Sequence, residues 1–247
     1  MTDVVVITGG SRGIGAATAV LFARRGWAVC VGYRTSAAAA LEVVAACEEI
    51  GAGAVAAPLD VASAESVASF FVMADTLGPI SALVNNAGIV DRRSRVDEMS
   101  APRLQRMFSV NSVGPFLCAG EAVRRMSTRY GGAGGAIVNV SSAASRLGSP
   151  GQYVDYAASK GAIDTMTLGL AREVASEGIR VNAVRPGLIE TGIHATGGEP
   201  DRVQRLEHEI PMQRGGRSDE VANAIAWLCS AEASYVTGAL VDVSGGR

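Results

Sequence analysis

The chain has 247 residues, of which 48% are apolar, with 30 glycines but only five phenylalanines and five tyrosines. A core of small and aliphatic side chains suits helices packed on a sheet, and the length fits one α/β domain. The formal charge of -2 and the lack of any basic block argue against nucleic acid as a partner, because phosphate binding needs clustered positive charge.

The sequence carries no recognisable export or membrane signal. It starts MTDVVVITGG, without a basic n-region or a cleavage site, and no apolar run approaches the ~20 residues that span a bilayer. We therefore expect a cytoplasmic protein. Its widely spaced cysteines each sit in an apolar stretch, which favours buried thiols over disulfides or metal ligands: Cys30, Cys47, Cys118 and Cys229.

Short β-branched runs alternate along the chain with longer amphipathic stretches. The helical pattern at 64–77 follows Asp60 and Ser63, and another at 219–230 follows Ser218. Because the β-branched runs are continuously apolar, the strands should be buried on both faces of a parallel sheet. We predict one domain, residues 1–247, with a Rossmann-type doubly wound α/β fold and helices on both faces. Its seven strands are expected at 4–8, 28–33, 54–59, 80–85, 135–141, 179–184 and 238–243.

Residues 190–217 break the alternation with Gly and Pro punctuation and short helical pieces. We interpret them as a substrate-loop insert over a binding crevice. His194 and His208 fall in this segment, but no third ligand lies at suitable spacing, so we predict no metal site. His194 is a candidate substrate contact.

The segment TGGSRGIG, from Thr8 to Gly15, follows the first expected strand and opens the first helix. Glycines there permit a tight turn and close backbone approach, while free amides at the helix start can face a pyrophosphate. A purely structural turn is the alternative, which this position disfavours. We predict a dinucleotide site that includes Gly9, Ser11, Arg12, Gly13, Ile14 and Gly15.

The residues after this turn indicate which cofactor binds. NAD sites usually place an acid about 20 residues further on, at the ribose 2′-hydroxyl. Here no Asp or Glu occurs between Asp3 and Glu42, and Arg12 and Arg34 lie where a 2′-phosphate needs positive charge. We expect NADP(H) to be preferred and NAD(H) to be possible, with two solvated surface arginines as the alternative.

Lys160 is the single lysine among 22 basic residues, which suggests a need that arginine does not meet. Tyr156 precedes it by four residues, so both side chains project from one face of a helix. A neighbouring ammonium is expected to lower the pKa of the phenol and make it a better proton donor and acceptor. Tyr153 has Ala157 at the same spacing and is expected in a loop, so Tyr156 is the better candidate.

Together, TGGSRGIG, NNAG at 85–88, YAASK at 156–160 and RPGLIET at 185–191 resemble the short-chain dehydrogenase/reductase family over essentially the whole chain. Its glucose dehydrogenase-like and 3-oxoacyl-acyl-carrier-protein reductase-like members are the most similar. The resemblance implies hydride transfer between a carbonyl and a secondary alcohol on a small-molecule substrate. It also implies a homotetramer or homodimer, joined through helices near 101–127 and 155–176.

The same resemblance assigns further residues. Asp60 and Val61 would contact the adenine, and Asn111 would hold a water that links Lys160 to solvent, a helix-interior amide being the alternative. The remaining positions implied to line the cofactor are Asn86, Ala87, Gly88, Pro186, Gly187, Ile189 and Thr191.

A serine should bond the substrate oxygen, and Ser142 is our choice because it stands at the end of a strand. Ser141 is the alternative, which strand alternation would point the other way. Ser142 lies 14 residues before Tyr156 where 13 is usual in the family, and Ala143 fills the usual position. We place the extra residue in the loop that follows.

Two other functions stay open. A carrier-protein-dependent 3-oxoacyl reductase would need a basic docking face, for which Arg124, Arg125 and Arg129 are candidates, with a solvated helix face as the alternative. A non-catalytic dinucleotide-binding regulator would keep the glycine turn, but the presence of both Tyr156 and Lys160 argues against it.

Overall fold

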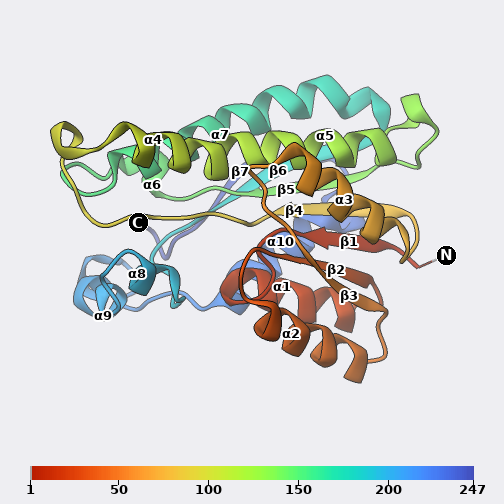
Figure 1. Ribbon diagram of the computed structural model, residues 1–247, viewed down its shortest axis with the longest axis horizontal. Coiled ribbons are helices and arrows are strands. Elements are labelled where there is room, and N and C mark those ends of the chain that lie inside the picture. The colour runs from red at the N-terminus through yellow and green to blue at the C-terminus, as the bar shows by residue number, and fades with distance from the viewer. Residues whose placement is uncertain (1) are drawn as a thin grey trace.

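A parallel sheet runs through the centre of the molecule (Figure 1). The computed structural model describes residues 2–247, and its seven strands lie in the order β3-β2-β1-β4-β5-β6-β7. The predicted doubly wound Rossmann-type fold is confirmed. The strands are β1 (Val4–Ile7), β2 (Ala28–Tyr33), β3 (Ala54–Pro58), β4 (Ile80–Asn85), β5 (Gly135–Val140), β6 (Ile179–Pro186) and β7 (Leu240–Val243).

The predicted strand positions agree with the structure to within two residues at each end. The largest differences lie in the last two strands. β6 continues to Pro186 because Arg185 and Pro186 pair with Asp242 and Val243 of β7. β7 begins at Leu240 rather than residue 238, because Gly238 adopts a left-handed turn with φ of 74°. Pairing with β7 therefore sets the end of β6, and the turn at Gly238 sets the start of β7.

Helices cover both faces of the sheet (Figure 1). One face packs on α1 (Gly13–Arg24), α2 (Ala37–Glu49) and α10 (Ser218–Cys229), with Phe22, Val43 and Ile225 in its core. The other packs on α3 (Ala64–Asp75), α5 (Gly114–Met126) and α7 (Val154–Val174), with α4 (Ala101–Phe108) alongside. All four cysteines are free and buried, as predicted.

Several helix boundaries differ from the prediction. The stretch expected as one helix near 101–127 is divided by a π-helical turn, Ser109–Val113, between α4 and α5. α10 begins at Ser218 itself, because the Glu220 carboxylate accepts a hydrogen bond from the Arg217 amide at 2.7 Å and caps the helix one residue earlier. Tyr153 lies immediately before α7, in a loop as predicted, and is buried there.

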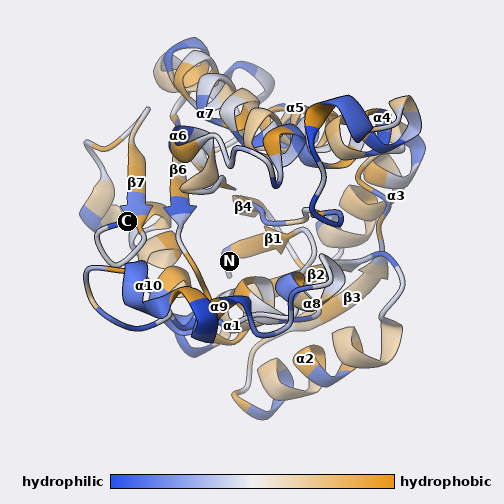
Figure 2. Ribbon diagram, turned by 90° about the vertical axis from the view of Figure 1, so that its left-hand side faces the viewer, coloured by the Kyte–Doolittle hydropathy of each residue, from blue (hydrophilic) through white to orange (hydrophobic). Residues whose placement is uncertain are grey.

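Short helices border the carboxyl ends of the strands. α6 (Ala144–Leu147) follows β5, in a stretch expected to be a loop, while α8 (Ile193–Thr196) and α9 (Arg202–Leu206) lie in the segment 190–217. In Figure 2 the strands are predominantly hydrophobic, whereas α9 is a hydrophilic element at the rim. Among the helices of residues 2–247, none combines the length and apolar character needed to cross a bilayer. Single 3-10 turns occupy Val96–Glu98, Thr128–Tyr130, Ala175–Glu177, Glu207–Glu209 and Ala231–Ala233.

Candidate active site

A cleft of about 460 Å³ opens at the carboxyl ends of the strands. Parallel α/β sheets bind ligands at this edge because the connecting loops and helix N-termini converge there. Every residue predicted for the site lines the cleft except Gly15 and Asn111, which lie beneath its surface. The structure therefore brings the predicted residues together from seven separate segments of the chain.

The glycine turn has the shape that a bound pyrophosphate needs. Gly9 has φ of 64°, and a Cβ there would lie 2.9 Å from the Ala87 Cα. A Cβ on Gly15 would lie 2.5 Å from the Gly9 carbonyl oxygen. The Arg12 side chain makes no capping hydrogen bond to α1 within residues 2–247, so the first amides of this helix can donate to a phosphate. The donors and the missing Cβ atoms fit a dinucleotide.

Hydrogen bonds join the glycine turn to the end of β4. The Asn86 Nδ2 donates to the carbonyl oxygens of Thr8 and Gly9 at 3.0 and 2.8 Å. The Thr8 Oγ1 accepts from the Asn86 and Ala87 amides at 3.0 and 2.9 Å. The floor of the cleft is consequently a rigid surface made mostly of backbone.

The other end of the nucleotide region carries a surface ion pair. Arg34 follows β2, and its Nε lies 3.6 Å from the Asp60 Oδ2, with both side chains well exposed. Thr35 and Ser36 also line the cleft beside Arg34. Sequence reasoning did not name these two hydroxyl groups, although their place directly after a predicted strand end could have indicated them.

Tyr156 and Lys160 occupy successive turns of α7 and face the cleft. The Lys160 Nζ lies 5.8 Å from the centroid of the Tyr156 ring and donates to the Val140 carbonyl oxygen at 2.8 Å. Ser142 lies near Tyr156, and its side chain acts to lower the pKa of the Tyr156 hydroxyl. Three polar groups from β5 and α7 thus meet at one end of the cleft.

The two adjacent serines point in different directions. The Ser141 Oγ donates to the Asp164 Oδ1 at 2.6 Å and is buried against α7. Both serines border the cleft, but the Ser141 hydroxyl already has acceptors in α7, whereas the Ser142 Oγ accepts from the Ala144 amide at 3.1 Å. Ser142, not Ser141, is therefore available to a bound molecule.

Burial shifts the pKa values of Tyr156 and Lys160. It raises the pKa of Tyr156, and the Ser142 side chain acts in the opposite direction. The expected lowering of the phenol pKa by Lys160 is not found: burial is the largest cause of the shift, and the opposing cause is Ser142. Burial also lowers the pKa of Lys160 to about 8, while the nearby Asp164 carboxylate opposes this shift.

Asn111 is held in the π-helical turn that separates α4 from α5. Its Nδ2 donates to the Ile89 carbonyl oxygen at 2.9 Å, and its Oδ1 accepts from the Ile89 amide at 2.8 Å. A Cβ placed on Gly88 would lie 3.4 Å from the Lys160 Nζ and 3.5 Å from the Asn111 Oδ1. Asn111 therefore fixes the chain after β4 close to Lys160, and its role in holding a water stays a prediction.

The end of the cleft beyond Tyr156 is lined by residues that sequence reasoning mostly missed. Of these only His194 was a candidate, and its Nε2 lies 3.0 Å from the Ile189 carbonyl oxygen. Burial lowers the pKa of His194, so the ring is neutral near pH 7. The others come from three separate segments of the chain: Val90, Leu147, Tyr153, Ile193 and Arg202.

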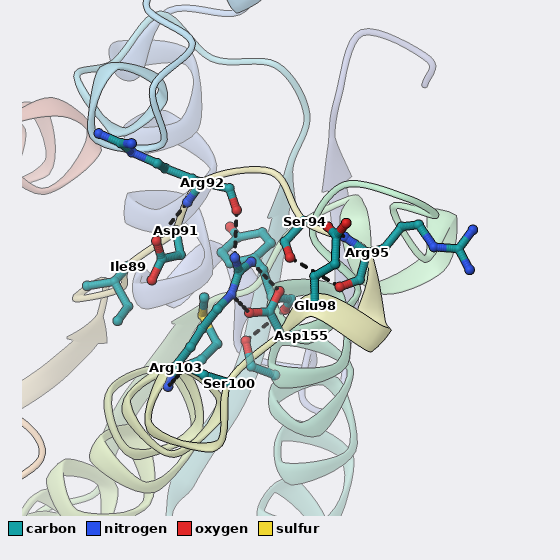
Figure 3. A network of polar contacts seen from close by, with 12 residues as sticks. Ile89, Asp91, Arg92, Ser94, Arg95, Glu98, Ser100, Arg103 and Asp155 are labelled. Atoms are coloured by element: carbon teal, nitrogen blue, oxygen red, sulfur yellow. Dashed lines mark hydrogen bonds and ion pairs between the residues drawn. The ribbon is translucent and has the colours of Figure 1, made fainter.

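A buried ion pair anchors the first turn of α7 (Figure 3). The Arg103 guanidinium of α4 donates to both carboxylate oxygens of Asp155, at 2.8 and 3.3 Å, and to the Arg92 carbonyl oxygen at 2.8 Å. The Asp155 side chain is fully buried. Asp155 directly precedes Tyr156, so this pair joins α4 and the loop after β4 to the end of α7 that carries Tyr156.

The arginines considered as a carrier-docking face are engaged with acids. Arg124 and Arg125 lie within 2.5 Å of the Glu121 carboxylate, and Arg125 also contacts Asp75 at 2.8 Å. Arg129 lies 4.0 Å from Glu177. No group of three or more His, Cys, Asp or Glu residues that could hold a metal ion occurs in residues 2–247.

Comparison with known proteins agrees with this geometry. A family profile described as enoyl-(acyl carrier protein) reductase matches residues 9–247. The Escherichia coli K12 protein named uncharacterized oxidoreductase YgfF is 54% identical over 99% of each chain. The chain belongs to the short-chain dehydrogenase/reductase family. This family comprises oxidoreductases that use NAD(P) and small-molecule substrates.

Two further members of the family show how widely the fold is used. Glucose 1-dehydrogenase 2 of Bacillus subtilis is 37% identical over 98% of this chain and 93% of its own. A crystal structure of a blue fluorescent protein from a metagenomic library, in complex with NADPH, superposes with a TM-score of 0.90 at 32% identity. That match covers 99% of this chain and 97% of the other. The predicted resemblance to the short-chain dehydrogenase/reductase family is confirmed.

Proposed function

We propose that the protein is an NADP(H)-dependent oxidoreductase that interconverts a carbonyl compound and a secondary alcohol. One observation carries this proposal. Ser142, Tyr156 and Lys160 converge at one end of a cleft whose other end is a glycine turn shaped for a pyrophosphate. The two ends together suit a dinucleotide with its reactive ring beside a proton donor.

Each residue has a chemical role in this proposal. The bound nicotinamide supplies or accepts the hydride. The Tyr156 hydroxyl donates a proton to the carbonyl oxygen, or accepts one from the alcohol in the reverse direction. Ser142 hydrogen-bonds the same oxygen, and Lys160 holds the ribose and the chain near Tyr156. Asn111 positions Lys160 and the exit of β4.

The charged groups of the nucleotide end support a preference for NADP(H). Arg34 stands at the end of β2, where NAD sites usually carry an acid, and Arg12 lies in the glycine turn. The pair with Asp60 at 3.6 Å is exposed, so it costs little to exchange for a phosphate contact. The NADPH found in a related structure is consistent with this preference.

The cofactor set proposed here keeps every predicted position. Gly9, Ser11, Gly13, Ile14 and Gly15 form the turn, Asp60 and Val61 border the adenine, and Asn86, Ala87 and Gly88 form the floor. Pro186, Gly187, Ile189 and Thr191 border the nicotinamide end, below the proposed substrate loop of residues 190–217.

The decisive experiment follows NADPH absorbance with a panel of ketones, sugars and acyl thioesters. Tyr156→Phe should lose nearly all turnover of any accepted substrate while NADPH binding stays measurable. Tyr130→Phe is the matched control, because Tyr130 is exposed in a turn away from the cleft. Near-normal turnover by Tyr156→Phe would refute the assignment.

The carrier-protein-dependent 3-oxoacyl reductase is the second candidate, favoured by the description of the matching family. The ion-paired state of Arg124, Arg125 and Arg129 weakens it, because these cations already have acidic partners. Comparing carrier-linked with free acyl substrates distinguishes the two, since a carrier-dependent enzyme would strongly prefer the linked form.

We also propose that the protein forms homodimers or homotetramers through the surface of α5 and α7. Val113, Phe116 and Leu168 are exposed there, with Phe116 at 56%. Apolar side chains gathered on helix surfaces are typical of interfaces. Light scattering should give two or four chains per particle, and Phe116→Glu should reduce that number.

A further inference from the structure

One buried carboxylate connects three separate segments at the substrate end of the cleft. Glu199 lies between α8 and α9, and its side chain is 12% exposed. The Tyr153 hydroxyl donates to its Oε2 at 2.5 Å, and the Arg202 guanidinium donates to the same oxygen. Arg93 and Arg205 approach its Oε1 at 3.4 and 2.5 Å.

Arg202 is the cation of this cluster that lines the cleft. It lines the cleft, is 13% exposed, and lies over the Tyr153 ring with its guanidinium carbon 5.1 Å from the centroid. Its second amino group donates to the Gln152 Oε1 at 2.9 Å. Both amino groups of Arg202 therefore already have acceptors, Glu199 and Gln152. Arg93 and Arg205 do not line the cleft, and both are nearly half exposed to solvent.

Two other ionisable groups that line the cleft, Arg247 and His194, are also paired or uncharged. Arg247 lines the cleft and pairs with Glu209 at 3.2 Å. His194 is neutral near pH 7, because burial lowers its pKa. The remaining lining there is largely apolar, with Val90, Leu147 and Ile193.

We propose that Glu199 determines substrate charge selectivity: by holding Arg202 in an ion pair, it makes the substrate end select uncharged carbonyl compounds over carboxylate-bearing ones. This inference rests on the proposed carbonyl reductase function. A carboxylate that enters the cleft loses its hydration, and it would meet a guanidinium whose amino groups already donate to Glu199 and Gln152. A site can discriminate against a ligand by leaving its charged group without a binding partner, and here the disfavoured ligand is a carboxylate-bearing substrate.

The experiment uses 3-, 4- and 5-oxo acids and their methyl esters, which differ in charge at nearly constant shape. With NADPH, the wild-type enzyme should turn over at least one ester with kcat/KM about tenfold or more above that of its acid. Glu199→Gln keeps a carbonyl acceptor for Tyr153 but removes the charge. This variant should raise kcat/KM for the acid about tenfold relative to the ester, mainly through KM.

Two further variants test the mechanism. Glu207→Gln is the matched control, because Glu207 is an exposed carboxylate of the same segment and its loss changes the net charge equally. It should leave the ester-to-acid ratio unchanged. The double variant Glu199→Gln with Arg202→Met should lose the gain for the acid, since the uncovered guanidinium is then absent.

The outcomes separate this inference from the proposed function. If esters are turned over but Glu199→Gln leaves the ratio of kcat/KM for ester to that for acid unchanged, the inference is overturned and the proposed function stands. An equal loss of kcat/KM for ester and acid in Glu199→Gln would also overturn the inference, because Glu199 would then only hold its segment in place. Turnover of no ester would overturn the inference as well, and the proposed function fails only if the wider carbonyl panel is also inactive.

Discussion

The nucleotide end and the substrate end of the cleft are built from different materials. The nucleotide end consists of glycines, backbone amides and the hydrogen bonds of Asn86, and its shape depends on the absence of Cβ atoms at Gly9 and Gly15. The substrate end combines an apolar lining with a cluster of charged side chains, centred on Glu199, from segments far apart in the chain. The first end should therefore be sensitive to volume and the second to charge.

The largest effect should follow a change of volume at the nucleotide end. In Gly15→Ala the new methyl group would lie 2.5 Å from the Gly9 carbonyl oxygen and 2.6 Å from the Asn86 Nδ2, so the turn must move. We expect NADPH affinity to fall on the order of 100-fold, measured by fluorescence titration. Gly169→Ala is the control, because a Cβ there meets open space. An affinity within about threefold of wild type would contradict a volume-limited site.

A change of charge next to Tyr156 should act on stability instead. Arg103→Ala would leave the Asp155 carboxylate buried without its partner. We expect the free energy of unfolding to fall by about 3–5 kcal/mol, measured by denaturant titration. Arg95→Ala removes one partner of the exposed Arg95–Asp97 pair and should change stability by no more than about 1 kcal/mol. Equal effects of the two variants would show that burial does not decide the strength of these pairs.

The pH dependence of stability should reveal the buried lysine that lies between the two ends. Burial lowers the pKa of Lys160 from 10.5 to about 8 in the folded chain. Between these values the unfolded chain binds more protons, so the stability of the wild type relative to Lys160→Met should rise with pH there and stay flat below pH 8. The total rise should be roughly 3 kcal/mol, measured by urea unfolding at a series of pH values. A constant difference would mean that Lys160 is not desolvated.

The smallest effect should come from the exposed cation of the nucleotide end. Arg34→Ala should lower the ratio of kcat/KM for NADPH to that for NADH about tenfold, because one charged phosphate contact is lost in partly solvated surroundings. Arg24→Ala, at the far end of α1, should leave the ratio unchanged. A wild-type enzyme that uses NADH as well as or better than NADPH would contradict the proposed preference.

The sequence by itself determined the features that depend on neighbouring residues. Periodicity predicted all seven strands, and the i, i+4 spacing put Tyr156 and Lys160 on one face of α7. Strand alternation separated Ser141 from Ser142. These features were predictable because backbone geometry relates each residue to those a few positions away, whatever the rest of the chain does.

The tertiary structure alone decided the features that join distant segments. The Glu199 carboxylate meets Arg93 across 106 positions and Tyr153 across 46, and Arg103 meets Asp155 across 52. It also decided that burial, rather than Lys160, sets the direction of the pKa shift of Tyr156. Ion pairs and desolvation depend on which side chains the strand order brings together, and local sequence periodicity holds no information about that order.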